Sequence, residues 1–411
     1  MTSASAPGRL DVMGGIADYS GSLVLQTPLK EETRCEVSRR DDRIVRIQSA
    51  NRAEVVSLDL ARLMRGGDLD TYAAAKAYFT SRPGEHWASY VVGVLLVLSR
   101  EERIFPKSGL TISIESDVPE GKGVGSSAAL EVAAMRACLE YLRRVFRPER
   151  IAEMCQIAEN RVVGAPCGIM DQMTASCGRR GMLMKLLCQP AELQGFAPLP
   201  DGVSVWGIDS GVRHSVAGSG YGSVRTGAAM GFRIIEQAEG GPDDRFGGYL
   251  ANVGPDALRE KFEKWLPDHM KGRDFLREFG GVSDTAVEID PGTSYPVKAP
   301  TMHPIHEHDR VSRFVSILEQ EPTKKNLAML GELMYLSHAG YSACGLGSPG
   351  TDRLVQMVRE VGYKQGLFGA RITGGGGGGT VAVLGRAEAK HRIHEIADQY
   401  ERETGLQTQI F

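Results

Sequence analysis

The stretch GLTISIESDVPEGKGVGSSAALEVA, residues 109–133, joins a strand pattern to a helix pattern through a glycine-rich loop. Residues 109–117 alternate apolar and polar side chains, as a half-buried strand does, and Pro119 and three glycines then interrupt the pattern. From Ser126 onward, apolar residues recur at helical spacing, at Leu130, Ala134, Cys138 and Leu142. Main-chain amides at the start of a helix attract anions. The stretch therefore predicts a phosphate-binding loop.

Three other interpretations of this loop are possible from the sequence. A Walker A loop needs Ser or Thr directly after its lysine, and Gly123 follows Lys122 here, so that interpretation fails. Gly123, Gly125 and Ala128 formally match the dinucleotide fingerprint GxGxxA. That fingerprint also needs a strand with a ribose-binding acid about 20 residues on, whereas a second helix pattern follows directly, at 149–163. A purely structural helix start remains open.

Outward from this loop, the patterns predict a mixed α/β (α+β) protein of two domains. Strands are expected in LDVMGG and SLVLQTPLKEETRCEVSRR before the loop, with a turn at 18–21 and helices at 73–80 and 87–100. The strand pattern at 203–211 opens the second half, so a domain boundary is expected near 190–200. Residues 240–296 predict helices joined by long loops. The remaining expected elements are helices at 326–339 and 350–361, strands at 369–373 and 380–384, and a helix from Arg386.

Composition narrows the class of protein. The chain has 411 residues, 48 basic and 51 acidic side chains and a net charge of −3, which fits a two-domain globular protein. No apolar run approaches the roughly 18 residues that span a bilayer, and no basic block predicts nucleic-acid or membrane binding. The partners are therefore expected to be small molecules. The seven cysteines form no CxxC motif and the N-terminus lacks a signal-peptide order, which predicts free thiols and a cytoplasmic location.

A second glycine-rich segment, ARITGGGGGGTVAVL, places six consecutive glycines, 374–379, between two apolar strand patterns. A hairpin needs only two turn residues, so the excess predicts close approach of the main chain to something else. An unstructured surface turn is the other possibility. Three charged residues, Arg9, Glu159 and Asp171, complete the candidates for chemistry, although each alone is more often a solvated or paired charge.

Taken together, these segments resemble the three motifs of the GHMP kinases, and specifically their galactokinase branch. GRLDVMGGIADYSG (8–21) resembles the first motif, PEGKGVGSSAALEVA (119–133) the second, which binds ATP, and GARITGGGGGGTVAV (369–383) the third. Further markers of the branch are HWASYVVGV (86–94), GAPCGIMDQ (164–172) and GVRHSVAGSGYGSVR (211–225). The resemblance spans the whole chain.

This resemblance implies a two-domain GHMP kinase fold with the active site between the domains. An N-terminal α/β domain (1–195) would bind ATP and sugar, and the C-terminal domain (196–411) would be ferredoxin-like. ATP and Mg²⁺ are the implied cofactors, with Ser127 and Glu159 as metal ligands. The implied nucleotide-binding residues are Gly121, Gly123, Gly125, Ser126, Ser127 and Ala128.

The resemblance also assigns roles around the acceptor sugar. Asp171 takes the position of the catalytic aspartate that receives the proton of the anomeric hydroxyl, and Arg9 that of the arginine that orients it. Asp18, Gly168 and Tyr221 match positions that contact the sugar ring. The loop near Tyr221 carries an extra residue compared with the family, which leaves this sugar contact open. A monomer or a weak homodimer is expected.

The first motif departs from the galactokinase pattern GEHTDYNGG, whose acidic residue and histidine hold the C6 hydroxyl of the sugar. Gly15 and Ile16 stand at these two places. A hexose would bury a hydroxyl against Ile16 without a partner, at a cost of about 1–3 kcal/mol. L-Arabinose has galactose-like ring stereochemistry and lacks this hydroxyl, and GGIADYSGSLVL resembles the kinase domain of plant L-arabinokinases. A uronic acid would call for a cation near residues 15–16, where none occurs.

The expected function is therefore an ATP-dependent sugar 1-kinase that makes L-arabinose 1-phosphate. A galactokinase with drift at positions 15 and 16 remains open, as does a sugar- and ATP-binding regulator of the same fold without catalytic activity. Retention of Arg9, Glu159 and Asp171 favours the enzyme. Two motif-like features are set aside: TMHPIHEHDR (301–310) lacks the HExxH spacing of a zinc site, and Cys167 has no histidine at a recognisable partner spacing.

Overall fold

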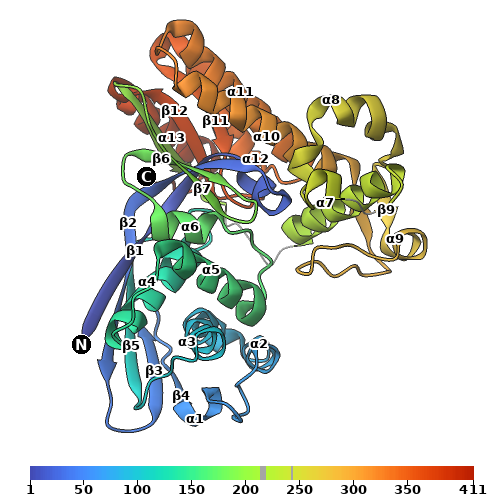
Figure 1. Ribbon diagram of the computed structural model, residues 1–411. Coiled ribbons are helices and arrows are strands. Elements are labelled where there is room, and N and C mark those ends of the chain that lie inside the picture. The colour runs from blue at the N-terminus through green and yellow to red at the C-terminus, as the bar shows by residue number, and fades with distance from the viewer. Residues whose placement is uncertain (213–218, 242–243) are drawn as a thin grey trace. The chain divides into compact units, whose positions relative to one another are not determined.

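The computed structural model describes residues 1–212, 219–241 and 244–411 (Figure 1). The chain forms two compact units, and each is described by itself. Unit 1 comprises Met1–Arg9, Pro28–Glu120 and Gly125–Arg180, and unit 2 comprises Leu10–Thr27, Gly121–Val124 and Gly181–Phe411. The chain crosses between the units several times, so the units are not two consecutive halves. The division into family domains 1–195 and 196–411 stays a prediction.

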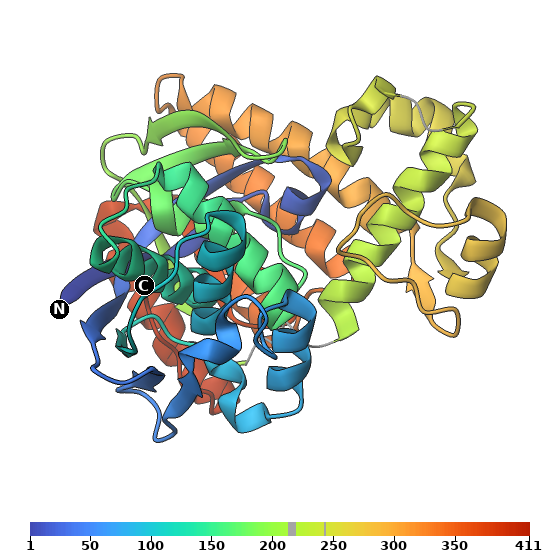
Figure 2. The ribbon, with the colours of Figure 1, turned by 60° about the horizontal axis from the view of Figure 1, so that its bottom comes forward.

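Unit 1 is a mixed sheet whose inner face is covered by helices (Figure 2). Its strands follow the order β4-β3-β5-β2, and β1 also pairs with β2. Strands β3 and β5 run parallel, and the β2–β5 and β3–β4 pairs are antiparallel. Its elements are β1 (Thr2–Met13), β2 (Leu23–Arg39), β3 (Ile44–Ser49), β4 (Val56–Asp59), α1 (Leu60–Leu63), α2 (Tyr72–Thr80), α3 (Ser89–Glu101), β5 (Leu110–Ser116), α4 (Ser126–Tyr141), α5 (Pro148–Ala158) and α6 (Met170–Cys177).

The strand alternation read from the sequence decides which face of this sheet is buried. Ile112 and Ile114 of β5 enter the core together with Val37 of β2 and Ile47 of β3, whereas the polar residues between them remain on the other face. Helix α3 is apolar on most sides, and residues 91–98 are all buried in this core. Burial of this apolar surface stabilises the sheet that carries β1 and supports helices α4 and α6.

Unit 2 contains the ferredoxin-like arrangement. Strands β11, β12 and β8 form an antiparallel sheet in that order, and residues 409–411 hydrogen-bond along the free edge of β8 as a fourth, strand-like segment. In chain order this is strand, helices, strand, strand, helix, strand, as the ferredoxin-like topology requires. The main elements of unit 2 are β6 (Met182–Leu187), β7 (Glu192–Pro198), β8 (Val203–Asp209), α7 (Ser219–Ala238), α8 (Pro255–Ala257), β9 (His269–Lys271), α9 (Gly272–Phe279), β10 (Ser294–Pro296), α10 (Lys298–Leu318), α11 (Lys324–Ala343), α12 (Pro349–Val361), β11 (Leu367–Ile372), β12 (Thr380–Arg386) and α13 (Lys390–Thr404).

The described residues of the Gly- and charge-rich segment 240–296, which are 240–241 and 244–296, contribute to a second hydrophobic core of unit 2. Aromatic residues from it, including Phe246, Phe262 and Phe275, pack with Phe232 of α7. The prediction of helices and loops is confirmed, and the structure adds the short antiparallel pair β9–β10. The predicted helices after residue 320 and both strands around the glycine run are confirmed as well.

The structure also bears on the expectations about membrane spans and cysteines. Within the described ranges, no helix is both long and apolar enough to cross a membrane. The seven cysteines are all described, and the structure joins none of them by a disulfide.

Candidate active site

Arg9 and Asp171 form a bidentate ion pair in unit 1. Arg9 lies on β1 with 3% of its surface exposed, and Asp171 is the second residue of α6. Arg9 Nε donates to Asp171 Oδ1 and Nη2 donates to Oδ2, each at 2.8 Å. The Asp171 side chain keeps 22% exposure. Two parallel charge-assisted bonds fix the plane of this carboxylate.

The glycine loop reaches this ion pair at Gly125. A Cβ atom at Gly125 would lie 3.0 Å from Arg9 Cγ and 3.7 Å from Asp171 Oδ2, and φ there is +72°. Glycine is needed at this point for both reasons. Gly125 is also the residue before α4, so Ser126, Ser127 and Ala128 form the first turn of that helix, with free main-chain amides at the turn. The structure thus brings Arg9, the end of the glycine loop and Asp171 together.

Ser127 and Glu159 also lie together in unit 1. The Glu159 carboxylate accepts from Gln172 Nε2 at 2.5 Å and from the Cys167 thiol at 3.5 Å, and the Ser127 side chain lies near enough to lower its pKa. Burial raises the pKa of Glu159 to about 7, against the lowering effect of Ser127, and nearby Asp171 raises it further. A carboxylate this deeply buried favours a bound cation.

The local helix geometry at Glu159 departs from the sequence pattern. The apolar spacing predicts one helix through residue 163, and α5 instead ends at Ala158 and continues as a π-helical turn, Glu159–Val163. Such turns are often found at functional sites because the extra residue re-aims a side chain. The periodicity of the sequence does not reveal this change.

Glu131 and Gln172 are buried polar residues near this site that the sequence motifs do not predict as functional. Gln172 Nε2 lies 3.4 Å from Glu131 Oε2 and so bridges Glu131 and Glu159. Burial, and next the charge of Glu159, raise the pKa of Glu131 well above its usual value. A glutamate among the small apolar residues of 128–139 is the signal that could have identified it.

In unit 2, Gly121 and Gly123 hold the first half of the loop in left-handed conformations, with φ of +72° and +69°. The six-glycine run packs against the rest of the chain. Cβ atoms at Gly376, Gly378 and Gly379 would lie 2.7–2.9 Å from Leu346, Val212 and the Lys122 carbonyl, respectively. The close approach predicted from the glycine excess is therefore confirmed, and its partner is the protein's own main chain.

The first motif folds in unit 2 as a 3-10 turn, Gly15–Ser20. Gly15 N donates to Asp11 Oδ1 at 3.2 Å, and Ile16 N donates to the Tyr341 hydroxyl at 2.8 Å. A Cβ atom at Gly15 would lie 1.7 Å from that hydroxyl, and φ is +50°. A side chain at position 15 would displace the Tyr341 hydroxyl and strain the main chain, so the acidic residue of the galactokinase pattern does not fit the turn as it stands.

Ile16 and Tyr221 belong to one apolar cluster of unit 2. Ile16 is 2% exposed and packs with Tyr221, Val224, Tyr341, Cys344 and Leu346. The Tyr19 ring meets Tyr221 edge to face at 5.9 Å, and Arg225 lies over Tyr19 while it binds Asp284 through two bonds. Burial lowers the pKa of Arg225, but its bonds to Asp284 raise it, and the charge of Asp18, which is 5% exposed, raises it further. The surroundings of Ile16 are thus largely apolar, whereas the galactokinase pattern has a polar residue at this position.

Helix α10, which contains the histidine-rich segment 301–310, supports the first motif. Glu307 Oε1 accepts from Gly14 N at 3.1 Å and from Ser337, and His308 Nδ1 accepts from Leu23 N at 3.0 Å. His303 packs on the Tyr341 ring, and burial lowers its pKa to about 4. The described residues contain no group of three or more His, Cys, Asp or Glu residues arranged to hold a metal. The segment is a structural support.

The remaining candidate residues have less definite surroundings. Gly168 is buried in the loop before α6, three residues before Asp171. His214 and its neighbours in GVRHSVAGSGYGSVR lie outside the described residues.

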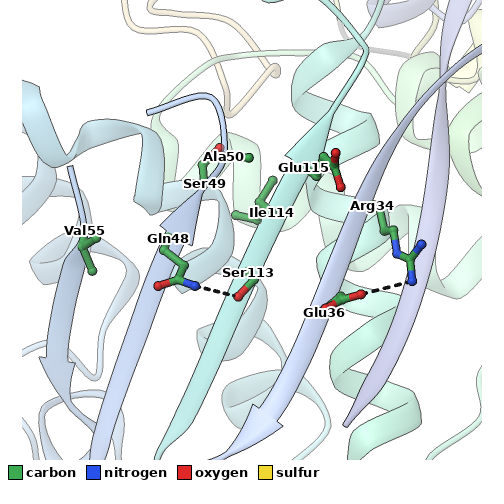
Figure 3. A pocket seen from close by; sticks show the side chains of 9 residues that line it. All are labelled: Arg34, Glu36, Gln48, Ser49, Ala50, Val55, Ser113, Ile114 and Glu115. Carbon is green, nitrogen blue, oxygen red and sulfur yellow. Dashed lines mark hydrogen bonds and ion pairs between the residues drawn. The ribbon is translucent and has the colours of Figure 1, made fainter. Parts of the chain in front are cut away.

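A separate groove of about 400 Å³ lies on the outer face of the unit 1 sheet (Figure 3). Several of its polar residues pair with each other: Arg34 forms an ion pair with Glu36 at 3.1 Å, and Gln48 Nε2 donates to Ser113 Oγ at 3.0 Å. Internally paired side chains on an open strand face are typical of a solvated surface, and the groove is not a candidate active site.

Comparisons with known proteins agree with this geometry. Residues 89–179 match the GHMP kinases N terminal domain, and residues 318–402 match the GHMP kinases C terminal domain. The chain thus contains the N- and C-terminal domains of the GHMP kinases. It is 40% identical to L-arabinokinase of Arabidopsis thaliana over 99% of this chain and 45% of that protein. The chain therefore spans less than half the length of this relative.

Solved structures support the same fold. Galactokinase of Lactococcus lactis complexed with galactose superposes with a TM-score of 0.76 at 18% identity, over 100% of this chain and 92% of that one. Mevalonate kinase of Methanococcus jannaschii gives a TM-score of 0.61 at 14% identity, over 100% and 96% of the two chains. The predicted GHMP fold is confirmed.

Proposed function

We propose that this chain is an ATP-dependent sugar 1-kinase that converts L-arabinose to L-arabinose 1-phosphate. The observation that carries the proposal is the bidentate Arg9–Asp171 pair beside Gly125 of the glycine loop. The two GHMP kinase domains support ATP as the donor. The apolar first-motif turn and the similarity to L-arabinokinase support the pentose as acceptor. The cytoplasmic location and the monomer or weak homodimer stay predictions.

In the proposed reaction, Asp171 accepts the proton of the anomeric hydroxyl while that oxygen bonds to the γ-phosphorus of ATP. The bond from the γ-phosphorus to the bridging oxygen breaks, and ADP leaves with that electron pair. Arg9 holds the carboxylate in its acceptor orientation through both nitrogens. Phosphoryl transfer depends mainly on positioning and on charge stabilisation, which a fixed base, a cation and helix amides supply.

The residues present fit Mg²⁺. Ser127 and Glu159 offer neighbouring oxygen ligands, and the Glu159 carboxylate is buried among neutral donors, a setting that a cation would stabilise. Mg²⁺ prefers one or two carboxylate or hydroxyl ligands and completes its shell with phosphate oxygens and water. When bound, the ion would neutralise charge on the transferred phosphoryl group.

The test is an ADP-release assay with L-arabinose, D-galactose, N-acetylgalactosamine and galacturonate at equal concentrations, with the phosphorylated carbon identified by NMR. L-Arabinose should react fastest. Galactose should react about 10²-fold more slowly, because apolar pockets reject an added hydroxyl only weakly. Faster turnover of galactose would identify a galactokinase. Sugar binding without ADP release from any sugar would identify a regulator.

A further inference from the structure

Lys122 is the charged residue inside the GKGVG loop, and the proposed reaction leaves it without a role. In the sequence, Lys122 serves only to rule out a Walker A loop, because Gly123 rather than Ser or Thr follows it. Main-chain amides carry partial charges, whereas the triphosphate of ATP carries several full negative charges. A full positive charge in this loop therefore complements the charge of the nucleotide that the proposed function places there.

The main chain at Lys122 is fixed within unit 2. Thr380 Oγ1 donates to the Lys122 carbonyl at 2.8 Å, and Gly379 approaches that carbonyl so closely that a Cβ atom would lie 2.7 Å from it. On the other side, a Cβ atom at Gly123 would lie 3.2 Å from the Thr373 carbonyl. The third motif thus clamps the loop at the residue that carries the ammonium group.

The side chain of Lys122 is aimed by Asp209 at the end of β8. The ammonium Nζ pairs with Asp209 Oδ2, and Asp209 Oδ1 accepts from Gly211 N at 3.1 Å. The Asp209 side chain is 1% exposed, whereas that of Lys122 is 21% exposed. Burial raises the pKa of Asp209, and Lys122 lowers it. The carboxylate is the buried partner, and the lysine side chain keeps part of its surface exposed.

We propose that Lys122 binds the terminal phosphates of ATP and that Asp209 is the positioning residue that holds its ammonium group for them. This inference rests on the proposed function, in which the same loop binds the nucleotide. An ammonium has three N–H donors, so one bond to Asp209 leaves two for phosphate oxygens. Lys122 stands four residues before Ser126, the first residue of α4, and the N-terminus of that helix favours phosphate.

The alternative is that the Lys122–Asp209 pair only pins the loop. Binding of ATP, ADP and AMP with Mg²⁺ separates the two, measured by calorimetry without sugar on the wild type, Lys122→Met, Lys122→Arg, Asp209→Asn and Thr380→Val. Thr380→Val is the matched control because it removes the hydrogen bond to the Lys122 carbonyl and leaves the charge of Lys122 unchanged. Melting temperatures report whether each variant folds.

Lys122→Met should weaken ATP binding roughly 10- to 30-fold, as expected for a lost charge-assisted contact. The loss should be smaller for ADP and absent for AMP. Lys122→Arg should retain most of the affinity, Asp209→Asn should lose about 3-fold for ATP alone, and Thr380→Val should keep the wild-type ratio of ATP to AMP affinity.

Two results would overturn the inference while leaving the proposed function intact: wild-type ATP affinity in a folded Lys122→Met, or equal losses for ATP, ADP and AMP in Lys122→Met, Asp209→Asn and Thr380→Val. Failure of the wild type to bind any of the three nucleotides would instead overturn the proposed function itself, and the inference with it. If Lys122→Met does not fold, the ratio of ATP to AMP affinity in Lys122→Arg and Asp209→Asn is compared instead. A lower ratio in Asp209→Asn than in Lys122→Arg supports the inference, and equal wild-type ratios in both overturn it.

Discussion

Two arginine–aspartate pairs begin two residues apart on the same strand, and they serve different ends. Arg9 pairs with Asp171, and Asp11 pairs with Arg371, each with its closest contact at 2.8 Å. The Asp171 side chain is 22% exposed, whereas both side chains of the Asp11–Arg371 pair are 0% exposed. The distance within an ion pair therefore does not reveal its function. Access to the carboxylate does.

The environments of the two carboxylates explain this contrast. Asp11 also accepts from Gln26 Nε2, Gly15 N and Gly374 N, so its oxygens tie the first motif to the third. The Arg371 guanidinium lies over the Tyr341 ring, 5.0 Å from its centroid. The Asp11–Arg371 pair, the sealed pair, is thus the buried support of two loops. The Arg9–Asp171 pair, the open pair, keeps an exposed carboxylate face, and the proposed reaction places the substrate hydroxyl there.

The largest effect is expected at the open pair. Asp171→Asn removes the proton acceptor but keeps the shape of the side chain, so kcat should fall about 10⁴-fold, equivalent to about 5.5 kcal/mol. Steady-state ADP release measures this fall. Nucleotide affinity and melting temperature should stay close to the wild type, as the control. Turnover at the wild-type rate would remove Asp171 from the mechanism.

At the sealed pair, the expected loss is of stability. Arg371→Met leaves the Asp11 carboxylate buried without its cation, which should lower the free energy of unfolding by about 4 kcal/mol. Urea denaturation followed by circular dichroism measures it. Arg9→Met serves as the matched variant, and its smaller cost should reflect the partial exposure of Asp171. Equal losses of unfolding free energy in Arg371→Met and Arg9→Met would contradict the proposed difference between the two ion pairs.

Glu159 sharpens the comparison because neutral donors, rather than an arginine, hold this carboxylate. Its pKa is about 7 in the folded protein against 4.5 ordinarily, so between these pH values the folded state binds a proton that the unfolded chain releases. Stability of the metal-free protein should therefore fall as pH rises through this window, by about 3 kcal/mol in all.

Urea denaturation in EDTA at pH 5 to 8 measures this fall, with Glu159→Gln as the control that lacks the titrating group. The variant should lose less stability than the wild type over the same range. Added Mg²⁺ should stabilise the wild type more at pH 8 than at pH 6, because the ion needs the ionised carboxylate. Parallel pH curves for the two proteins would show that Glu159 is not the group responsible.

Much of this architecture is readable from the sequence because periodicity and glycine punctuation are local signals. The strand, loop and helix at 109–141 follow the pattern closely, and Arg9, Gly125 and Asp171 meet as the motifs imply. The sealed pair is not readable in this way. Asp11 and Arg371 are 360 residues apart, and each looks like an ordinary charge until the tertiary fold buries both.

The same limit applies to Glu131 and to the π-helical turn at Glu159. Local propensity gives no reason to bury Glu131, and the apolar spacing of 149–163 is satisfied equally by an uninterrupted α-helix. The excess of glycine in the run 374–379 correctly predicts a close approach of the main chain, but the sequence does not identify Leu346, Val212 and Lys122 as the residues that it approaches. Long-range packing decides these features.

The smallest expected effect tests how tightly the sealed pair restricts the first motif. Gly15 and Gly66 both have positive φ, +50° and +88°, but a Cβ atom at Gly66 meets nothing within 4 Å, whereas one at Gly15 meets Tyr341, Arg371 and Asp11. Gly66→Ala should cost about 1 kcal/mol of backbone strain. Gly15→Ala should cost about 3 kcal/mol, because Tyr341 must also give up its bonds to Ile16 and Gly374. The difference of about 2 kcal/mol, measured by urea denaturation, is the contribution of the contact. If the two alanine variants unfold at the same urea concentration, the turn can shift away from Tyr341, and an acidic side chain at position 15 would not be excluded by packing.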